Sequence, residues 1–304
     1  MDKNIFSLKN EQSSFFVYKP FDLDNPDFIM VIAHGLAEHA ERYYKLCEFM
    51  YNHNVLSFAI FHPGHGKYTL EPGVWPEKGF FVSINNMDTL IDYVKTKFPS
   101  KKIVLFGHSM GSFLSLGYIE KHGEKLDLCI LSGTNDAQPK SLSSAGTFIS
   151  SLICKISGRN KPSKLLNNMS FGSFNKSFSP NRTEFDWLSK DEKEVNKYVE
   201  DPLCGFIPSA GLFRDLLEGL TQIYKPEAIE KIPKALPVHI LGGSNDPVGN
   251  FGKGLEALQK RLLKHHINHV TLKIYENNRH ECINETNSSV VMSDVYVICQ
   301  DTML

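Results

Sequence analysis

The segment KKIVLFGHSMGSFLSLGYIEK at residues 101–121 decides the fold of this chain. Its first part is a short apolar run rich in β-branched and aromatic residues, which is typical of a buried strand. Its last part carries apolar residues at helical spacing. A strand-to-helix turn is therefore predicted between them, at the Gly-x-Ser-x-Gly pattern formed by Gly107, Ser109 and Gly111.

This pattern is that of a nucleophile elbow, in which a serine sits on a sharp, strained turn. Small residues are needed at Gly107 and Gly111 because a side chain there would collide with the neighbouring strand or helix. Ser109 then opens a helix whose unpaired N–H groups and dipole favour a negatively charged oxygen. A structural turn serine is the alternative, but the flanking strand and helix favour a catalytic one.

Composition narrows the class of protein. With 304 residues and 41% hydrophobic content, the chain is long enough for one large α/β domain with an insertion, or for two small domains. A net charge of -1 gives no electrostatic reason to bind nucleic acid. The N-terminus is charged and no run approaches about 18 apolar residues, so we expect a cytoplasmic location. The six cysteines show no metal-binding spacing, and neither a disulfide framework nor a zinc site is indicated.

Strand-like and helix-like segments alternate along most of the chain. Two short runs, residues 6–8 and 15–18, predict an antiparallel hairpin at a sheet edge. Further strand-like runs, most of them followed by a turn and a helical pattern, lie at residues 28–33, 55–61, 103–106, 126–131, 238–241 and 270–275. A helix is also marked at residues 90–98. Because parallel strands need crossover helices, this order predicts an α/β fold with a mostly parallel sheet covered on both faces.

Residues 136–224 depart from this alternation, since strand patterns disappear and short amphipathic pieces remain. We expect residues 1–135 and 225–304 to form the core and residues 136–224 to form a helical cap over the carboxyl edge of the sheet. An apolar stripe at residues 148–156 has two interpretations. It is either an acyl-chain entrance or membrane-touching lip, or a cap helix packed on its neighbours, which is the favoured one. Trp187 either lines a pocket or anchors the cap.

A serine nucleophile needs a base to take its proton and an acid to orient that base. Loops at the carboxyl ends of strands offer Ser109, Asp246 and His280. Their order along the chain is the one associated with the α/β-hydrolase architecture. Asp136 is the rival acid. Asp246 is favoured because it directly follows a strand in a glycine-rich turn and precedes a proline, which holds its backbone extended.

The oxyanion of such a reaction needs two backbone donors. The N–H of Met110, after the nucleophile, is one candidate, and the N–H of Leu36, in the loop after the strand at residues 28–33, is the other. Three more histidines, His34, His65 and His108, also lie near strand ends. We expect these three to brace loops through hydrogen bonds to the backbone.

Five separated motifs carry a family resemblance. They are HGLAEH at residues 34–39 followed by RY at 42–43, GHG at 64–66, GHSMG at 107–111, DPV at 246–248, and RHE at 279–281 followed by NE at 284–285. Together they resemble the monoacylglycerol lipase and lysophospholipase-like branch of the α/β-hydrolases, over about residues 28–285. The resemblance implies a Ser109, Asp246 and His280 triad, an oxyanion hole from the Leu36 and Met110 amides, a helical cap and a lipid ester substrate. It implies no cofactor and no metal.

Two features depart from the family pattern. The turn around Gly64 normally has an aspartate three positions before it and a serine after it, whereas this chain has Phe61 and Tyr68, which puts the bracing of that loop in doubt. The cap resembles the family only loosely, so substrate identity carries over poorly.

The sequence therefore predicts a carboxylic ester hydrolase that acts on a small-molecule acyl ester, of monoacylglycerol or lysophospholipid type, through an acyl-enzyme. Transient membrane contact through the cap is a further expectation. One alternative is an amide or aminopeptidase-type hydrolase with the same triad. It would need an acidic group for a free amine, from Glu218 or residues 191–194, which are better explained as a solvated face. Another alternative is a non-catalytic binding protein of the same fold.

Overall fold

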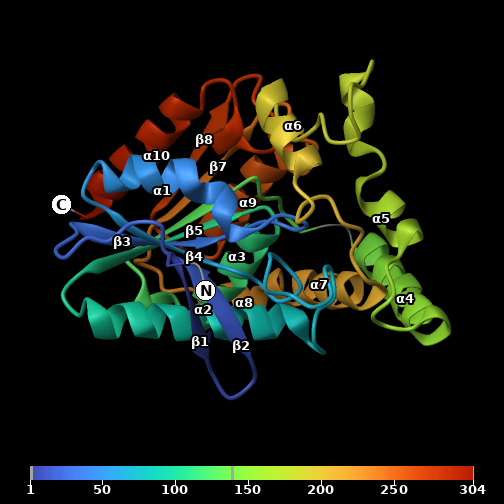
Figure 1. Ribbon diagram of the computed structural model, residues 1–304, viewed down its shortest axis with the longest axis horizontal. Coiled ribbons are helices and arrows are strands. Elements are labelled where there is room, and N and C mark those ends of the chain that lie inside the picture. Colours follow the sequence, from blue (N-terminus) through green and yellow to red (C-terminus); the bar gives the residue numbers. More distant parts are fainter. Residues whose placement is uncertain (1–2, 138–139, 304) are drawn as a thin grey trace.

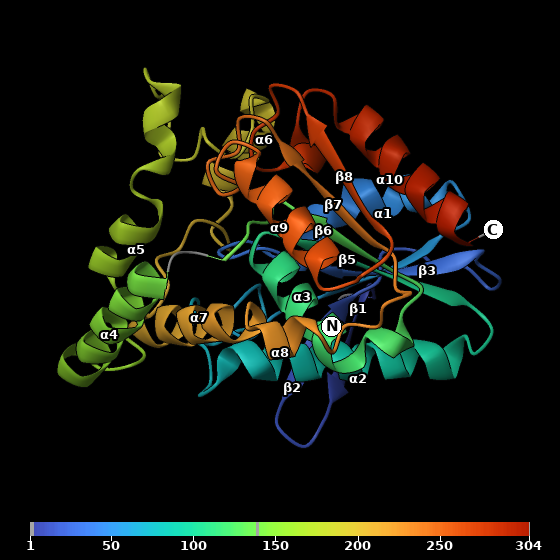
Figure 2. The ribbon, with the colours of Figure 1, turned by 180° about the vertical axis from the view of Figure 1, so that it is seen from behind.

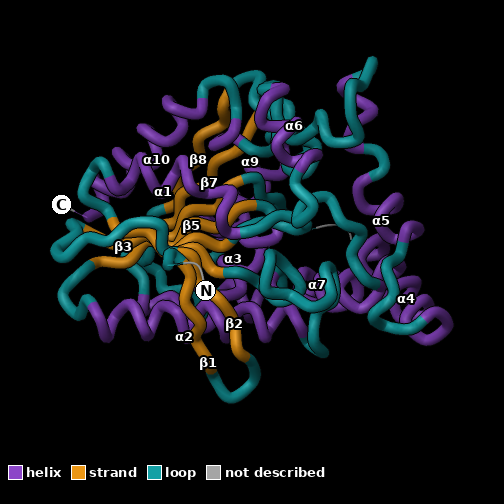
Figure 3. Tube along the Cα trace, viewed as in Figure 1, coloured by secondary structure: helices purple, strands orange, loops and turns teal. Residues whose placement is uncertain are grey.

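The computed structural model describes residues 3–137 and 140–303, and a central sheet organises them (Figure 3). Its eight strands lie in the order β1-β2-β4-β3-β5-β6-β7-β8. The strands from β4 to β8 in that order run parallel, and β1 and β2 pair antiparallel at one edge. The predicted mostly parallel sheet and edge hairpin are therefore confirmed. The bounds are β1 (Ile5–Lys9), β2 (Ser14–Tyr18), β3 (Phe28–Ala33), β4 (Leu56–Ile60), β5 (Lys102–His108), β6 (Leu128–Ser132), β7 (Val238–Gly243) and β8 (Val270–Tyr275).

Helices cover both faces of the sheet (Figure 1). One face packs against α1 (Tyr44–Tyr51) and α10 (Ser288–Met303), and the other packs against α2 (Gly79–Lys97), α3 (Met110–His122) and α9 (Lys253–Lys264). Every residue of β3 is buried, because its alternating side chains enter one apolar cluster or the other. The short helices of the core are η1 (Ala40–Tyr43), η2 (Gly123–Lys125), α8 (Pro226–Ile229) and η4 (Cys282–Asn284).

The helix predicted at residues 90–98 is only the second half of α2, which begins at Gly79. Its first half lacks a clean apolar stripe because polar side chains are buried there. Asn86, for example, is fully buried and accepts hydrogen bonds from Asn10 and Ser13 of the β1–β2 turn. Polar residues that satisfy one another inside the protein hide the helical period from a pattern based on hydrophobicity.

The order of the strands reverses beside β3. The chain passes from β3 to β4 on one side, and then crosses back to β5 on the other side. In open α/β sheets, ligands bind outside the carboxyl ends of strands at such a switch point. The register pairs Ala33, at the end of β3, with Gly107 of β5. The loop after β3 and the turn after β5 therefore start side by side.

The predicted cap region lies between β6 and β7 and is helical in its described part, with α4 (Lys140–Ser157), α5 (Lys164–Phe171), η3 (Phe174–Phe178), α6 (Glu192–Glu200) and α7 (Ala210–Ile223). Residues 138–139 of the predicted cap lie outside the described residues. Helices α4 and α5 project at one end of the molecule in both views (Figure 1, Figure 2). Helix α7 packs against α4 and also against α2 and α3, so it joins the projecting helices to the core.

The apolar stripe of α4 is split between two environments. Ile149 and Ile153 are partly buried against a small cluster that includes Leu166 and Phe213. Phe148 and Ile156 remain 70% and 74% exposed. Packing on neighbouring helices thus accounts for one side of the stripe and leaves the other side facing outward. None of the described helices is long and apolar enough to cross a membrane.

Candidate active site

Ser109 occupies a strained turn between β5 and α3, with φ 51° and ψ −119°. Positive φ is unfavourable for a residue with a side chain, and such strain is often found at functional sites. The glycines on either side make the turn feasible. A Cβ at Gly111 would lie 2.0 Å from the Ala33 carbonyl oxygen, and one at Gly107 would lie 2.3 Å from Ser115 Oγ. The predicted need for small residues at both positions is confirmed.

His280 and Asp246 form a buried pair in the loops after β8 and β7. His280 Nδ1 lies 3.0 Å from Asp246 Oδ2, and both side chains are almost fully buried. The other Asp246 oxygen accepts the Val248 N–H at 2.8 Å, which fixes the carboxylate. The rival acid Asp136 instead pairs with Arg261 of α9, whose Nε lies 2.5 Å from its Oδ1. The geometry therefore favours Asp246 as the partner of the base.

The pair lies beside the elbow. The His280 ring is 4.7 Å, centroid to centroid, from the ring of His108, the residue that precedes Ser109. Gly133, at the end of β6, leaves room for both rings, because a Cβ there would lie 2.9 Å from His108 Cε1 and 3.0 Å from His280 Cε1. The ends of four neighbouring parallel strands, β5 to β8, thus bring the three predicted catalytic residues to one edge of the sheet.

Electrostatics separates His280 from the other buried histidines nearby. Burial lowers the pKa of His34 and His65 to about 3 and that of His108 to about 4. Burial acts to lower the pKa of His280 too, but the Asp246 carboxylate, with smaller contributions from Glu281 and Glu38, raises the His280 pKa above its ordinary value. Among these four histidines, His280 alone has a pKa that its surroundings raise, so its imidazole is the strongest base of the four.

Each of the histidines His34, His65 and His108 makes a hydrogen bond through its Nδ1 atom. His34 Nδ1 lies 2.7 Å from the Gly35 carbonyl oxygen, and His65 Nδ1 lies 2.8 Å from the Pro63 carbonyl oxygen. Backbone bracing is therefore confirmed for these two residues. The prediction is wrong for His108, whose Nδ1 lies 3.3 Å from the side-chain oxygen of Ser132. The neighbouring strand β6 brings that hydroxyl into reach.

The loop after β3 passes directly against Ser109. A Cβ at Gly35 would lie 3.2 Å from Ser109 Cβ, and the Gly35 N–H donates to Glu38 Oε1 at 2.6 Å. Leu36 follows in the same loop. Met110 is the first residue of α3, so its N–H has no acceptor within the helix. Both predicted oxyanion donors therefore belong to segments that border Ser109.

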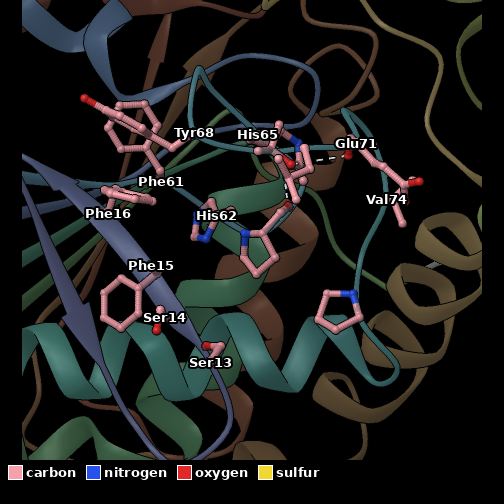
Figure 4. Close-up of a pocket in the computed structure, with 15 residues that line it drawn as sticks. Ser13, Ser14, Phe15, Phe16, Phe61, His62, His65, Tyr68, Glu71 and Val74 are labelled. Carbon is pink, nitrogen blue, oxygen red and sulfur yellow. Dashed lines mark hydrogen bonds between the residues drawn. The ribbon is translucent and has the colours of Figure 1, made fainter. Parts of the chain in front are cut away.

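The loop at residues 62–66 is braced by aromatic packing in place of the family's polar residues. The Tyr68 ring stacks on Phe16 of β2 at 4.1 Å and meets Phe61 edge-on at 6.2 Å. Figure 4 shows these rings grouped together on one side of a groove of about 430 Å³. Phe61 and Tyr68, which departed from the family pattern, therefore support the loop through their ring faces.

The predicted cap contacts His280 through Trp187, whose role the sequence left undecided. The Trp187 ring lies 5.0 Å from the His280 ring, and its carbonyl oxygen accepts the His280 N–H at 3.4 Å. Phe171 and Phe174 pack on the other parts of the indole, at 6.5 and 5.1 Å. An aromatic wall thus runs from the base into the cap. Their large separation along the chain hid this contact from sequence reasoning.

One described group has the donor set of a metal site. His39, Asp201 and Cys204 offer ligand atoms within 4.8 Å of one another. The His39 Nε2 already lies 2.8 Å from Asp201 Oδ2, and Asp201 Oδ1 accepts the Leu203 N–H. The contact between His39 and Asp201 therefore joins the loop after β3 to the cap. All six cysteines are described, and each has a free thiol.

Comparison with known proteins gives consistent matches. The family model described as "Serine aminopeptidase, S33" matches residues 24–287. The chain is 30% identical over 258 residues to the monoglyceride lipase of Homo sapiens, which covers 84% of this chain and 76% of that protein. It is 26% identical over 275 residues to the monoacylglycerol lipase of Mycolicibacterium smegmatis, which covers 89% and 87%. A thermostable carboxyl esterase from Bacillus coagulans superposes with a TM-score of 0.89 at 25% identity, over 99% and 98% of the two chains.

The His280–Asp246 pair predicts a measurable titration. Because the Asp246 carboxylate stabilises the imidazolium, Asp246→Asn should lower the pKa of His280, and wild-type His280 should titrate above 6.5. NMR of the imidazole resonances against pH would measure both values. Asp136→Asn is the matched control and should leave the His280 pKa unchanged. The same pKa in wild type and Asp246→Asn would contradict the assignment.

Proposed function

The chain belongs to the serine aminopeptidase S33 family, in the monoacylglycerol lipase-like branch of the α/β-hydrolases, and it is a carboxylic ester hydrolase; on this premise we propose that it hydrolyses monoacylglycerol-type lipid esters through an acyl-enzyme on Ser109. One observation carries the mechanism. Ser109 sits on a strained turn beside a buried histidine whose pKa is raised by a buried aspartate. This is the arrangement that turns a serine hydroxyl into a nucleophile.

In the first half-reaction, Ser109 Oγ attacks the ester carbonyl carbon while His280 Nε2 takes the hydroxyl proton. Asp246 accepts a hydrogen bond from His280 Nδ1–H and stabilises the imidazolium that forms. The carbonyl oxygen becomes an oxyanion, which the N–H groups of Leu36 and Met110 would stabilise by about 3 kcal/mol each. When the intermediate collapses, the C–O bond to the alcohol breaks, and His280 gives its proton to the departing alcohol.

In the second half-reaction, water replaces the alcohol. His280, neutral again, takes a proton from the water as its oxygen attacks the acyl carbon. The oxyanion forms at the same two amides. Its collapse breaks the bond to Ser109 Oγ, returns the proton to the serine and releases the fatty acid. Each group ends in its starting state.

The cap supports a lipid acyl chain as the substrate's apolar part. Beyond Trp187, the chain of aromatic contacts continues from Phe171 to Phe213 of α7 at 6.2 Å. Side chains of this kind stabilise an acyl chain by removing its methylene groups from water, about 0.8 kcal/mol for each group. The names of the human and mycobacterial relatives agree with this choice.

The aminopeptidase alternative needs a free carboxylate for a substrate ammonium group, and Glu194, one of the predicted sources, does not fit. Glu194 was expected on a solvated face but is buried, where Lys45 and Lys197 lie 2.5 and 2.7 Å from its Oε1. Its charge is therefore already neutralised. Glu218 is exposed on α7. The pairing of Glu194 with two lysines favours ester over peptide cleavage, despite the description of the family.

The outward face of the cap supports contact with a lipid surface. Large apolar side chains that are about half or more exposed gather on α4 and α5, namely Phe148, Leu152, Ile156, Leu165 and Met169. Monomeric proteins rarely expose a contiguous apolar patch without a use for it. A monoacylglycerol resides in membranes, so an apolar face next to the site would shorten its path to Ser109. We extend the proposal to transient membrane contact through these helices.

Ser109→Ala should lower kcat on a monoacylglycerol by about 10⁴-fold or more, with little change in the free energy of unfolding, because binding and the oxyanion donors remain. Asp246→Asn should cause a large loss, whereas Asp136→Asn should stay near wild type. The matching acyl amide should be cleaved far more slowly than the ester. Steady-state kinetics with thermal melts of each variant would measure this. Substantial ester turnover by folded Ser109→Ala would refute the mechanism.

Replacing Phe148 and Ile156 together by serine should weaken sedimentation with phosphatidylcholine vesicles and slow hydrolysis of monoacylglycerol embedded in them. Hydrolysis of p-nitrophenyl acetate, which is water-soluble, should not change. The control is Phe251→Ser, at a residue 44% exposed before α9. Vesicle binding that is equal in wild type and the double variant would rule out this surface as the membrane contact.

A further inference from the structure

A buried arginine connects the loop after β3, which carries the proposed oxyanion donor Leu36, to the loop after β8, which carries His280. Arg42 of η1 donates through Nη1 to Glu38 at 2.6 Å, and through Nη1 and Nη2 to the two oxygens of Glu281 at 2.7 Å each. The side chains of Arg42, Glu38 and Glu281 are 10%, 4% and 5% exposed. Charge-assisted, bidentate bonds of this kind fix orientation as well as distance.

Each carboxylate holds one part of the site. Glu38 accepts the N–H of Gly35, immediately before the oxyanion donor Leu36, and it also accepts the hydroxyl of Tyr43 at 2.9 Å. Glu281 directly follows the base His280. The side chain of Glu281 also accepts a bond from Asn284 at 2.9 Å, so this end of the network is fully engaged.

The cap closes over the arginine. The guanidinium carbon lies 4.8 Å from the centre of the Tyr198 ring, and the Tyr198 hydroxyl donates to the Ala37 carbonyl oxygen at 2.8 Å. The N–H of Gly205 donates to the same carbonyl oxygen at 2.9 Å. Arg42 is therefore enclosed between the core and the cap, where water cannot replace its hydrogen bonds.

An ion network of two carboxylates and one guanidinium is an expensive way to stabilise a fold, since burying charges costs several kcal/mol per ion and an apolar cluster would serve as well. The Arg42–Glu281 bonds span 239 positions of the chain, and they join the loop after β3 to the loop after β8. Catalysis, by contrast, depends on the distance between the reacting groups, because a shift of about 1 Å in their positions can cost about 100-fold in rate.

We propose that Arg42 is a positioning residue, which sets the distance between the oxyanion-donating loop and the base-bearing loop through Glu38 and Glu281. It does not touch the substrate in this role. The proposal rests on the proposed function of Ser109, His280 and the Leu36 amide.

The main test uses Arg42→Lys, which keeps the charge but loses the bidentate geometry. We expect kcat on a soluble p-nitrophenyl ester to fall about 10- to 100-fold, while KM changes less than about threefold. The matched control is Arg159→Lys, because Arg159 also pairs with a buried carboxylate, Asp215 of α7, at 2.7 Å, but its other bonds go to the carbonyl oxygens of Trp75 and Pro76, in the segment before α2. The control should keep wild-type kcat. Equal kcat values for Arg42→Lys and the control would overturn the proposal.

The pH profile gives a readout that a merely structural role would not produce. The charged and titratable groups acting on His280 are Asp246, Glu281, Glu38 and His108. Glu281→Gln removes a negative charge beside the base, so its acidic limb of kcat/KM should move to lower pH while kcat falls. Arg42→Lys should lose kcat with the limb unmoved. If Arg42→Lys loses kcat and its acidic limb of kcat/KM also moves, the loss comes from a changed His280 pKa, and the positioning role is contradicted.

A second pair of variants keeps the proposal testable if Arg42→Lys does not fold. Glu38→Gln and Glu281→Gln release the same guanidinium from opposite sides, so their effects on kcat should be strongly non-additive in the double variant. Independent, multiplying effects would overturn the proposal. Ser109→Ala is measured in parallel. If Ser109→Ala still hydrolyses the ester, the proposed function itself is refuted. If Ser109→Ala loses ester turnover but Arg42→Lys keeps wild-type kcat, only the positioning role is refuted.

Discussion

The strained backbone at Ser109 is the constraint on which the rest of the structure depends. A positive φ at a residue with a side chain persists only where its surroundings leave no alternative. Here β5 is held between β3 and β6, and Gly111 lies so close to the end of β3 that no Cβ fits. The same close approach sets the loop after β3 against Ser109. One packing condition therefore places the nucleophile and a candidate oxyanion donor together.

Burial then differentiates side chains that are chemically alike. Histidines that are buried with only neutral partners become poor bases, whereas His280, buried with an aspartate, becomes a better one. The carboxylates follow the same logic, because Asp246 faces the imidazole while Asp136 is occupied by Arg261. The cap takes part as well, since Trp187 contacts the base and the segment after it bonds to Glu281 through the Leu188 carbonyl oxygen. The inner side of the cap thus contacts His280 and Glu281, and its outer side exposes apolar residues.

Much of the fold could be predicted because its central strands are unbroken apolar runs bounded by glycine turns. The strand at Phe28–Ala33 has the same bounds in sequence and structure. The first half of α2 could not be predicted, because its buried polar residue Asn86 bonds to Asn10 and Ser13 of the distant β1–β2 turn. The buried state of Glu194 and the hydroxyl partner of His108 were missed for a related reason. Each of these two features depends on a partner that is distant in the chain, and so does the bridge from Arg42 to Glu281. Patterns within a short stretch of sequence cannot predict such pairs.

The central claim is that Ser109 becomes the acyl carrier with its oxyanion held by the loop after β3 and the start of α3. The most direct measurement is a crystal structure of the protein after reaction with a long-chain alkyl fluorophosphonate. We predict a phosphorus bond to Ser109 Oγ, a phosphoryl oxygen within hydrogen-bond distance of the Leu36 and Met110 N–H groups, and an alkyl chain directed along Trp187 into the cap. An intact protein with Ser109 unmodified, or with the phosphoryl oxygen turned away from both amides, would contradict it.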